Sequence, residues 1–261
     1  MPAPAKFPHN PVRTALRKRQ LTLGGWIQVG HPVVAEIFAH AGFDWVALDG
    51  EHTDIALAES ANLFRGLHGR GPAPFVRVRE NDTLAIRQVL DLGALGVIVP
   101  LVHTAADATR AVRAAKFPPQ GERGFAFFRA NNYGADFAAY AQNANEQIAV
   151  VVMIESRQAV ENIEEILAVE GVDGVFIGPY DLSGSYGLAG QLDHPTVVRA
   201  QKKVVAACAA AGRSAGLHLV GPTPENIAET IKRGFTFIAL GMDTVFLRES
   251  AKAVLAAAMK A

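Results

Sequence analysis

The 261-residue sequence has a single cysteine, Cys208, and no apolar run long enough to cross a bilayer. One cysteine excludes an internal disulfide and a thiolate metal site, and in its alanine-rich surroundings we expect Cys208 to be a small buried filler. Residues 1–20 are polar, basic and broken by prolines, without the apolar core of a signal peptide. These features predict a cytoplasmic location.

An excess of charge of either sign is also absent. Lys and Arg number 25, as do Asp and Glu, so the net charge is zero. Nothing therefore indicates a nucleic-acid-binding patch or a cationic membrane helix. We expect a protein that acts on a small molecule.

Several catalytic motifs are missing as well. No G-x-G-x-x-G follows the first predicted strand, which weakens a dinucleotide-binding interpretation, and there is no G-x-S-x-G. No lysine lies in or at the end of a predicted strand, where a Schiff-base enzyme would need one. Carbonyl chemistry on this chain would therefore use a metal. The lysines are Lys6, Lys18, Lys116, Lys202, Lys203, Lys232, Lys252 and Lys260.

What is present is an alternation of short apolar runs and helical patterns. The helical stretches carry apolar residues at i, i+3, i+4 and i+7, and several end at a glycine before the next apolar run. Strands are predicted at 23–30, 44–50, 74–79, 95–100, 148–155, 174–178, 214–219 and 236–241. Helices are predicted at 32–42, 54–67, 82–93, 104–116, 157–169, 194–212, 222–234 and 243–259.

Eight such units in one chain of this length predict an α/β fold, a single-domain (β/α)8 TIM barrel over residues 1–261. Residues 1–20 form an N-terminal extension or helix. An open doubly wound sheet is the alternative. The stretch 117–147 is too long for an idle loop, so we predict a functional loop followed by a short helix.

Two successive predicted strands each finish on a carboxylate, Glu155 in VVMIES and Asp181 in FIGPYDLS. Adjacent barrel strands lie about 5 Å apart, so both groups can reach one cation. Two carboxylates without thiolate or clustered imidazole favour Mg²⁺ or Mn²⁺. Alternatively, Asp181 caps a short helix and Glu155 pairs with an arginine such as Arg157.

Other strand ends carry further polar residues. Arg77 in PFVRVR is either an oxyanion clamp or part of a structural ion pair, and alternation places Arg79 on its face. His52 in LDGEH is a candidate general base, with Asp91 as a candidate orienting carboxylate, unless it is simply a solvated loop histidine. His218 is a polar residue of the seventh strand to which we assign no role.

Long blocks of the chain resemble the HpcH/HpaI aldolase family of class II, metal-dependent pyruvate aldolases. The matching stretches run in order over nearly the whole chain: AGFDWVALDGEH (41–52), PFVRVREND (74–82), QVLDLGALGVIVPLV (88–102), AAKFPPQGERG (114–124), MIESRQAVENIEEILAVEGVDGVFIGPYDLS (153–183) and ALGMDTVFL (239–247).

The resemblance implies reversible aldol cleavage of 4-hydroxy-2-oxo acids to pyruvate and an aldehyde. It implies a TIM barrel that assembles as a homohexamer, a dimer of trimers with exchanged C-terminal helices. The divalent ion would be Mg²⁺ or Mn²⁺, with Co²⁺, Ni²⁺ or Zn²⁺ as other choices.

By the same resemblance each motif residue acquires an expected role. Glu155 and Asp181 would bind the metal, and Arg77 would hold the enolate oxygen. His52 with Asp91 would move a proton through water. The remaining expected site residues are Asp49 and Glu51 in the same hydrogen-bond network, Gly178, Pro179, Tyr180 and Asp181 at the carboxylate of pyruvate, Trp26 near the mouth, and Arg129 in the long loop.

The chain departs from the family pattern at Met153, where relatives have glutamine, and at Tyr180, where they have a small residue. Two alternative functions differ in class. One is a lyase acting on an acyl-CoA or another 2-oxo acid, and the other is a non-catalytic barrel that binds an oxo acid.

Overall fold

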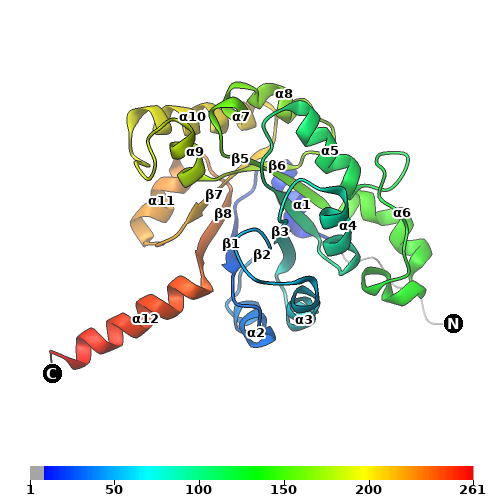
Figure 1. Cartoon of the computed structure of the whole chain (residues 1–261), viewed down its shortest axis with the longest axis horizontal. Coiled ribbons are helices and arrows are strands. Elements are labelled where there is room, and N and C mark those ends of the chain that lie inside the picture. Colours follow the sequence, from blue (N-terminus) through cyan, green and yellow to red (C-terminus); the bar gives the residue numbers. More distant parts are fainter. Residues whose placement is uncertain (1–8, 261) are drawn as a thin grey trace.

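In the computed structural model, which describes residues 9–260, the chain forms a closed barrel of eight parallel strands in sequential order. Every predicted strand is present within a few residues of its expected limits, so the TIM-barrel prediction is confirmed (Figure 1). The strands are β1 Thr22–Ile27, β2 Trp45–Asp49, β3 Ala73–Arg77, β4 Gly96–Val99, β5 Ala149–Ile154, β6 Gly174–Ile177, β7 Ser214–Leu219 and β8 Phe237–Met242.

Helices follow the strands and cover the outside of the barrel (Figure 1). The predicted helix at 157–169 is divided in two at Asn162, whose backbone leaves helical geometry. The helices are α1 Pro11–Lys18, α2 Pro32–His40, α3 Leu57–Leu67, α4 Thr83–Asp91, α5 Ala105–Ala115, α6 Phe137–Gln147, α7 Arg157–Glu161, α8 Ile163–Ala168, α9 Pro179–Ser185, α10 Pro195–Ala210, α11 Pro224–Lys232 and α12 Asp243–Ala258, with a 3-10 segment η1 Arg129–Gly134.

The long stretch 117–147 holds η1 and α6, so it is structured as predicted and ends in the expected short helix. Residues 1–8 of the predicted N-terminal extension lie outside the described residues, and α1 forms the part that is described.

The inside of the barrel is filled by aromatic side chains. Trp45 and Phe237 stack with ring centroids 4.1 Å apart, and Phe75 lies beside them. A Cβ atom on Gly96 would lie 2.1 Å from the Phe75 ring, so the neighbouring strand must carry glycine there. Leu16 of α1 belongs to the same buried cluster and closes the amino-terminal end of the barrel.

Cys208 is fully buried in the layer between barrel and helices, and burial raises the pKa of its thiol to about 12. This confirms the expected filler role. Among the described residues, no helix combines the length and the apolar character needed to span a membrane.

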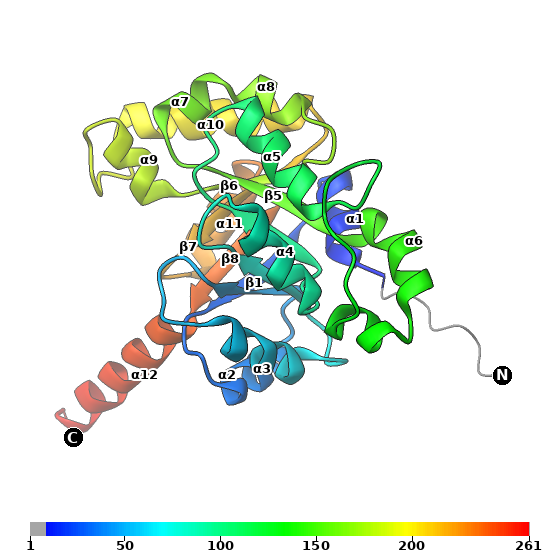
Figure 2. The same cartoon turned by 45° about the vertical axis from the view of Figure 1, so that its right-hand side comes forward.

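The helix α12 does not pack along the barrel like the others. It extends away from the barrel, and the C-terminus lies at its far end (Figures 1 and 2). Its large apolar side chains are exposed: Leu247 64%, Val254 71%, Leu255 63% and Met259 80%. A helix with this composition is covered only when another molecule packs on it.

Candidate active site

The carboxyl ends of β2 and β3 bring an aspartate and an arginine together. Asp49 and Arg77 are register partners in the parallel pair. The guanidinium Nε and Nη2 of Arg77 donate to the two carboxylate oxygens of Asp49 at 3.0 and 2.7 Å. This two-point contact fixes the plane of the guanidinium group at the mouth of the barrel.

Asp49 is held from several sides. The backbone amides of Glu51 and His52 each donate to it at 3.2 Å, and the Gln28 side-chain amide donates at 3.1 Å. Burial alone would raise the pKa of Asp49, but the hydrogen bond and positive charge of Arg77 outweigh it and hold the pKa below its usual value. Asp49 therefore remains anionic and serves as the anchor of Arg77.

Glu51 lies on the other side of the same guanidinium. Its Oε2 is 3.2 Å from Nη1 of Arg77 and 3.7 Å from Nε2 of His52. Burial raises the pKa of Glu51; the charge of Arg77 opposes this shift, and that of Glu155 adds to it. Glu51 therefore holds a proton at higher pH than an ordinary glutamate, next to an imidazole that is largely exposed.

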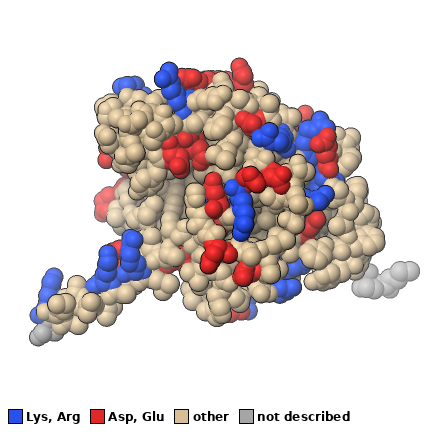
Figure 3. All heavy atoms as spheres, viewed as in Figure 1, with Lys and Arg blue, Asp and Glu red and all other residues tan. Residues whose placement is uncertain are grey.

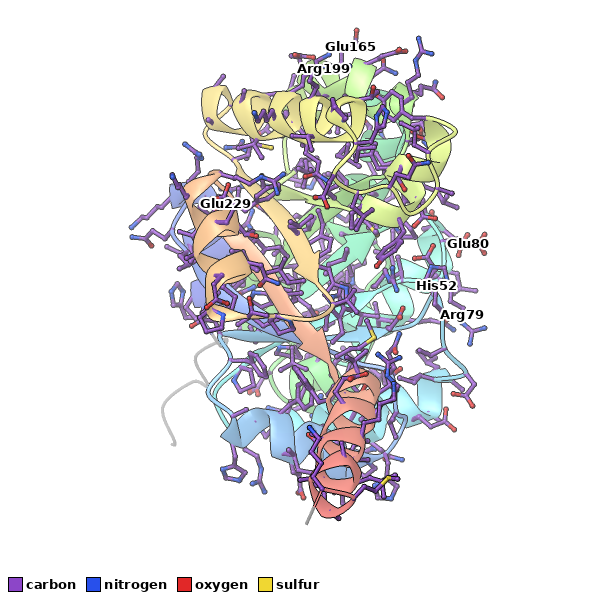
Figure 4. The ribbon with its side chains drawn as sticks, turned by 90° about the vertical axis from the view of Figure 1, so that its left-hand side faces the viewer. His52, Arg79, Glu80, Glu165, Arg199 and Glu229 are labelled. Atoms are coloured by element: carbon purple, nitrogen blue, oxygen red, sulfur yellow. The ribbon has the colours of Figure 1, made fainter. Side chains whose placement is uncertain are left out.

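Figure 4 shows His52 on the same side of the molecule as Arg79 and Glu80, which follow β3. Arg79 lies two residues beyond the end of β3 and is exposed. It lines a hollow that Arg77 also borders, but it does not line the cavity described below, so its predicted place on the face of Arg77 stays a prediction. Acidic and basic side chains are mixed near the centre of the face shown in Figure 3.

The two predicted metal ligands lie close enough to affect each other. Glu155 follows β5, is 7% exposed, and accepts a hydrogen bond from the Leu101 amide at 2.7 Å. Burial raises the pKa of Glu155, and the negative charge of Asp181 raises it further. Asp181 lies in the first turn of α9, so it belongs to a short helix and still reaches the site.

The alternative pairing of Glu155 with Arg157 is not made, because Arg157 is bonded to Glu161. No cluster of three or more His, Cys, Asp or Glu side chains suited to a metal occurs among residues 9–260. Two carboxylates close enough to interact, with the pKa of Glu155 raised by burial and by the charge of Asp181, supply only oxygen donors and fit a hard divalent ion. Water and substrate would have to complete its coordination.

A cavity of about 310 Å³ opens at this end of the barrel. Trp26 lies in its wall, with the Arg77 guanidinium 4.9 Å from the centre of the indole ring. Tyr180 is 55% exposed and stands at the rim. The cavity is lined by four of the predicted charged or titratable site residues, Asp49, His52, Arg77 and Asp181. The other lining residues are Trp26, Gln28, Met153, Phe176, Ile177, Gly178, Pro179, Tyr180, His218, Val220 and Met242.

Two predicted site residues lie elsewhere in the chain. Asp91, at the end of α4, accepts a hydrogen bond from Arg123 at 2.7 Å, and no contact with His52 is made within residues 9–260. Arg129 donates to the backbone oxygens of Leu92 and Phe64 beside a second hollow. Their catalytic roles stay predictions, and within the part of one chain that is described they are not brought to the cavity.

The amide of Leu101, which donates to Glu155, was not predicted from the sequence. Leu101 has a φ of 57°, which aims its N–H at the carboxylate. Every residue except proline has such an amide, so no side-chain pattern could have indicated it. His218 was noticed without a role, and it lines the cavity.

A family model for "HpcH/HpaI aldolase/citrate lyase" matches residues 22–250, so the chain belongs to this family. It is 37% identical over 243 residues to 2-dehydro-3,6-dideoxy-6-sulfogluconate aldolase of Pseudomonas putida, covering 93% of this chain and 94% of that protein. It is 35% identical to 5-keto-4-deoxy-D-glucarate aldolase of Shigella sonnei, covering 94% of each.

The fold agrees with this membership. The crystal structure of an HpcH/HpaI aldolase/citrate lyase family protein from Burkholderia cenocepacia superposes with a TM-score of 0.91 at 32% identity, covering 96% of this chain and 99% of that one. The relatives are aldolases, which supports a carbon–carbon lyase acting on a small molecule.

Proposed function

We propose that the protein is a metal-dependent aldolase that cleaves 4-hydroxy-2-oxo acids reversibly to pyruvate, or a close 2-oxo acid, and an aldehyde through an enolate. The observation that carries the proposal is that Asp181 lines the cavity where Arg77 is fixed by Asp49, and that the buried Glu155 lies close enough to Asp181 and Arg77 for their charges to shift its pKa. The described residues that line the cavity include no lysine for carbonyl chemistry. Lys116, the buried lysine of the described part of the chain, is bonded to backbone carbonyls.

Glu155 and Asp181 would hold the divalent ion, with Mg²⁺ or Mn²⁺ best matched to carboxylate oxygens. When bound, the ion would supply Lewis-acid polarisation of the 2-oxo group. Arg77 directs its cationic face toward the same oxygen and stabilises negative charge as it develops there, which is usually the largest catalytic contribution. The backbone amides at the start of α9, which no side chain caps, are available to the carboxylate of the substrate.

Glu51 and His52 would together transfer the proton of the substrate 4-hydroxyl. Burial raises the pKa of Glu51, and its carboxylate lies 3.7 Å from Nε2 of His52, so the two groups are placed to exchange a proton. His52 is exposed, so a water molecule can pass the proton to the substrate. The expected support from Asp91 would require a second copy of the chain, because Asp91 of the same chain pairs with Arg123.

Assembly is part of the proposal. We propose that α12 is exchanged between subunits of a homohexamer, as the family resemblance implies. The four exposed apolar side chains of α12 support this, because the barrel of the same chain leaves them uncovered.

The alternatives find less support. A CoA thioester calls for basic surface, and among the described residues lining the cavity Arg77 is the one Lys or Arg side chain, already paired with Asp49 and Glu51. A non-catalytic oxo-acid binder has no use for Glu51, whose raised pKa suits proton transfer.

The test is proton NMR of pyruvate in D₂O with the purified protein and Mg²⁺ or Mn²⁺, before and after EDTA. Loss of the methyl signal that EDTA abolishes would establish metal-dependent enolisation without a guess about the aldehyde. Glu155→Gln and Asp181→Asn are expected to lose both the exchange and the bound metal measured by elemental analysis. Glu165→Gln, on the exposed side of α8, is the matched control.

Two results would overturn the proposal. One is full metal occupancy in both carboxylate variants. The other is the absence of exchange with either metal, with and without added aldehyde.

A further inference from the structure

A buried arginine in the long stretch 117–147 has an incomplete set of hydrogen bonds. Arg123 is 1% exposed, and its Nη2 donates to Oδ1 of Asp91 at 2.7 Å and to the hydroxyl of Tyr140 at 2.8 Å. Its Nε and Nη1 are buried and have no hydrogen-bond partner within the described residues. Buried donors are nearly always paired, so two unpaired nitrogens on one guanidinium group are not explained by stability alone.

The other cations of this region are bonded as structural groups usually are. Lys116 and Arg129 both donate to backbone carbonyl oxygens. Arg123 instead directs its charged hydrogen bond to a side-chain carboxylate, and Asp91 is the one carboxylate with which it forms an ion pair among residues 9–260. The feature that distinguishes Arg123 is therefore its hold on Asp91.

Aromatic rings fix the plane of the guanidinium group. The central carbon of Arg123 lies 4.6 Å from the centre of the Phe117 ring and 5.4 Å from the centre of the Tyr140 ring. The two rings pack edge to face, with centroids 5.9 Å apart. A planar cation against two packed rings keeps one orientation, and the hydroxyl of Tyr140 fixes Nη2 further. The direction from which Asp91 is held is thereby set.

Asp91 is held through one of its two oxygens. Its Oδ2 accepts no hydrogen bond within the described part of the chain, and its side chain is 19% exposed where that of Arg123 is fully buried. Asp91 also borders a small hollow with Phe128 and Phe137. The free oxygen can therefore accept a hydrogen bond from a group outside this chain.

We propose that Arg123 is a positioning residue that orients Asp91, so that the free carboxylate oxygen meets His52 of a second copy of the chain. The proposal rests on the aldolase function and the assembly argued above, in which Asp91 supports His52 from another copy. Arg123 touches no substrate. An imidazole that donates to a fixed carboxylate keeps one ring orientation and one tautomer, which leaves its other nitrogen available to the water that passes the proton.

The test is a double-mutant cycle on the cleavage of 4-hydroxy-2-oxopentanoate, with rates expressed per folded, metal-loaded enzyme. Asp91→Asn and Arg123→Lys are each expected to lower kcat about tenfold or more. KM should change little, because neither side chain contacts the substrate. The double variant is expected to be no slower than Asp91→Asn alone, because Arg123 acts only through Asp91.

Tyr140→Phe is a milder second variant, because it keeps the guanidinium group and removes one acceptor. It is expected to lower kcat in the wild-type background and to have no effect on kcat in the Asp91→Asn background. If Arg123→Lys does not fold, this pair of measurements decides alone. Arg113→Lys, exposed on α5 and paired with Glu122, is the matched control.

Three results would overturn the inference: a wild-type kcat in Asp91→Asn, effects of Arg123→Lys and Asp91→Asn that multiply in the double variant, or an equal effect of Tyr140→Phe in both backgrounds. A merely structural arginine would give the second of these, since loss of structure does not depend on Asp91. If wild type cleaves the substrate and exchanges pyruvate protons, such a result removes only this inference. If wild type does neither, the proposed function fails first.

Discussion

At the scale of single residues, the central feature of the site is Arg77, whose guanidinium group is held by two carboxylates. Asp49 accepts hydrogen bonds from two guanidinium nitrogens of Arg77, and Glu51 lies beside the third. The guanidinium group therefore keeps one orientation toward the cavity. The strand-end positions of Asp49, Arg77, Glu155 and Asp181 could be predicted from the sequence, because parallel strands end together. The contact of the Leu101 amide with Glu155 could not, since it depends on a backbone group from a distant segment.

Arg77→Lys tests the fixed guanidinium. Alanine would leave the buried Asp49 charge without a partner, whereas lysine keeps the charge and loses the planar fork. We expect pyruvate exchange and aldol cleavage to fall about 10²-fold or more, the size of one lost oxyanion contact. Arg79→Lys, two residues on and exposed, should leave both rates near wild type. Near-normal turnover of Arg77→Lys with an unchanged melting temperature would contradict the enolate role.

At the scale of elements, periodicity in the sequence located each strand and nearly each helix, because each strand must bury both faces and each helix one. Periodicity did not indicate the break at Asn162 or the position of α12 away from the barrel (Figure 1), and the exchanged C-terminal helix was expected from the family resemblance alone. Periodicity reports which side of a helix is apolar, but not what covers it. Periodicity also does not report contacts of the long stretch 117–147, which supplies Arg123 as the partner of Asp91 and holds Arg129, the donor to the backbone oxygens of Leu92 and Phe64.

Lys116 ties this long stretch to the barrel. Its ammonium group donates to the backbone oxygens of Asn145 and Ile148 at 2.7 and 2.6 Å, at the end of α6. Burial, with the positive charge of Arg13 adding to it, lowers the pKa of Lys116 to about 7, against 10.5 ordinarily. Between these values the unfolded chain binds more protons at this position than the folded chain, so a rise in pH stabilises the fold here.

We therefore compare the free energy of unfolding of wild type and Lys116→Met by denaturant titration from pH 7 to pH 10. The advantage of wild type is expected to grow with pH, by at most about 1.4 kcal/mol per pH unit. Lys203→Met, on the partly exposed side of α10, should show no such trend. A difference that stays constant over this range would show that Lys116 stays charged in the fold, and one that shrinks would show that its pKa is raised.

At the scale of the whole molecule, the sequence predicted one barrel and the structure has one, but a single chain leaves two things incomplete. The apolar side of α12 is uncovered, and Asp91 has no path to His52 within the described residues. Family resemblance, and not periodicity, was the source of the hexamer prediction, because contacts between copies leave no regular spacing in a sequence.

The combination of Leu247→Glu and Leu255→Glu tests the role of α12. Charges placed in an apolar interface oppose association, so we expect a clear fall in molar mass by size-exclusion chromatography with light scattering. Lys252→Glu changes charge on the same helix without touching its apolar residues and serves as the control. A wild-type protein that elutes as a monomer would contradict the exchange of α12.

The packed interior of the barrel also has a kinetic consequence. Trp45, Phe75 and Phe237 fill the space beneath the cavity, and α1 closes the far end. Within the described residues the cavity is therefore open at the carboxyl end of the barrel and closed beneath. If the proposed cleavage takes place there, the fragment nearer solvent would leave before the one at Arg77, and inhibition patterns should reveal an obligatory order of product departure.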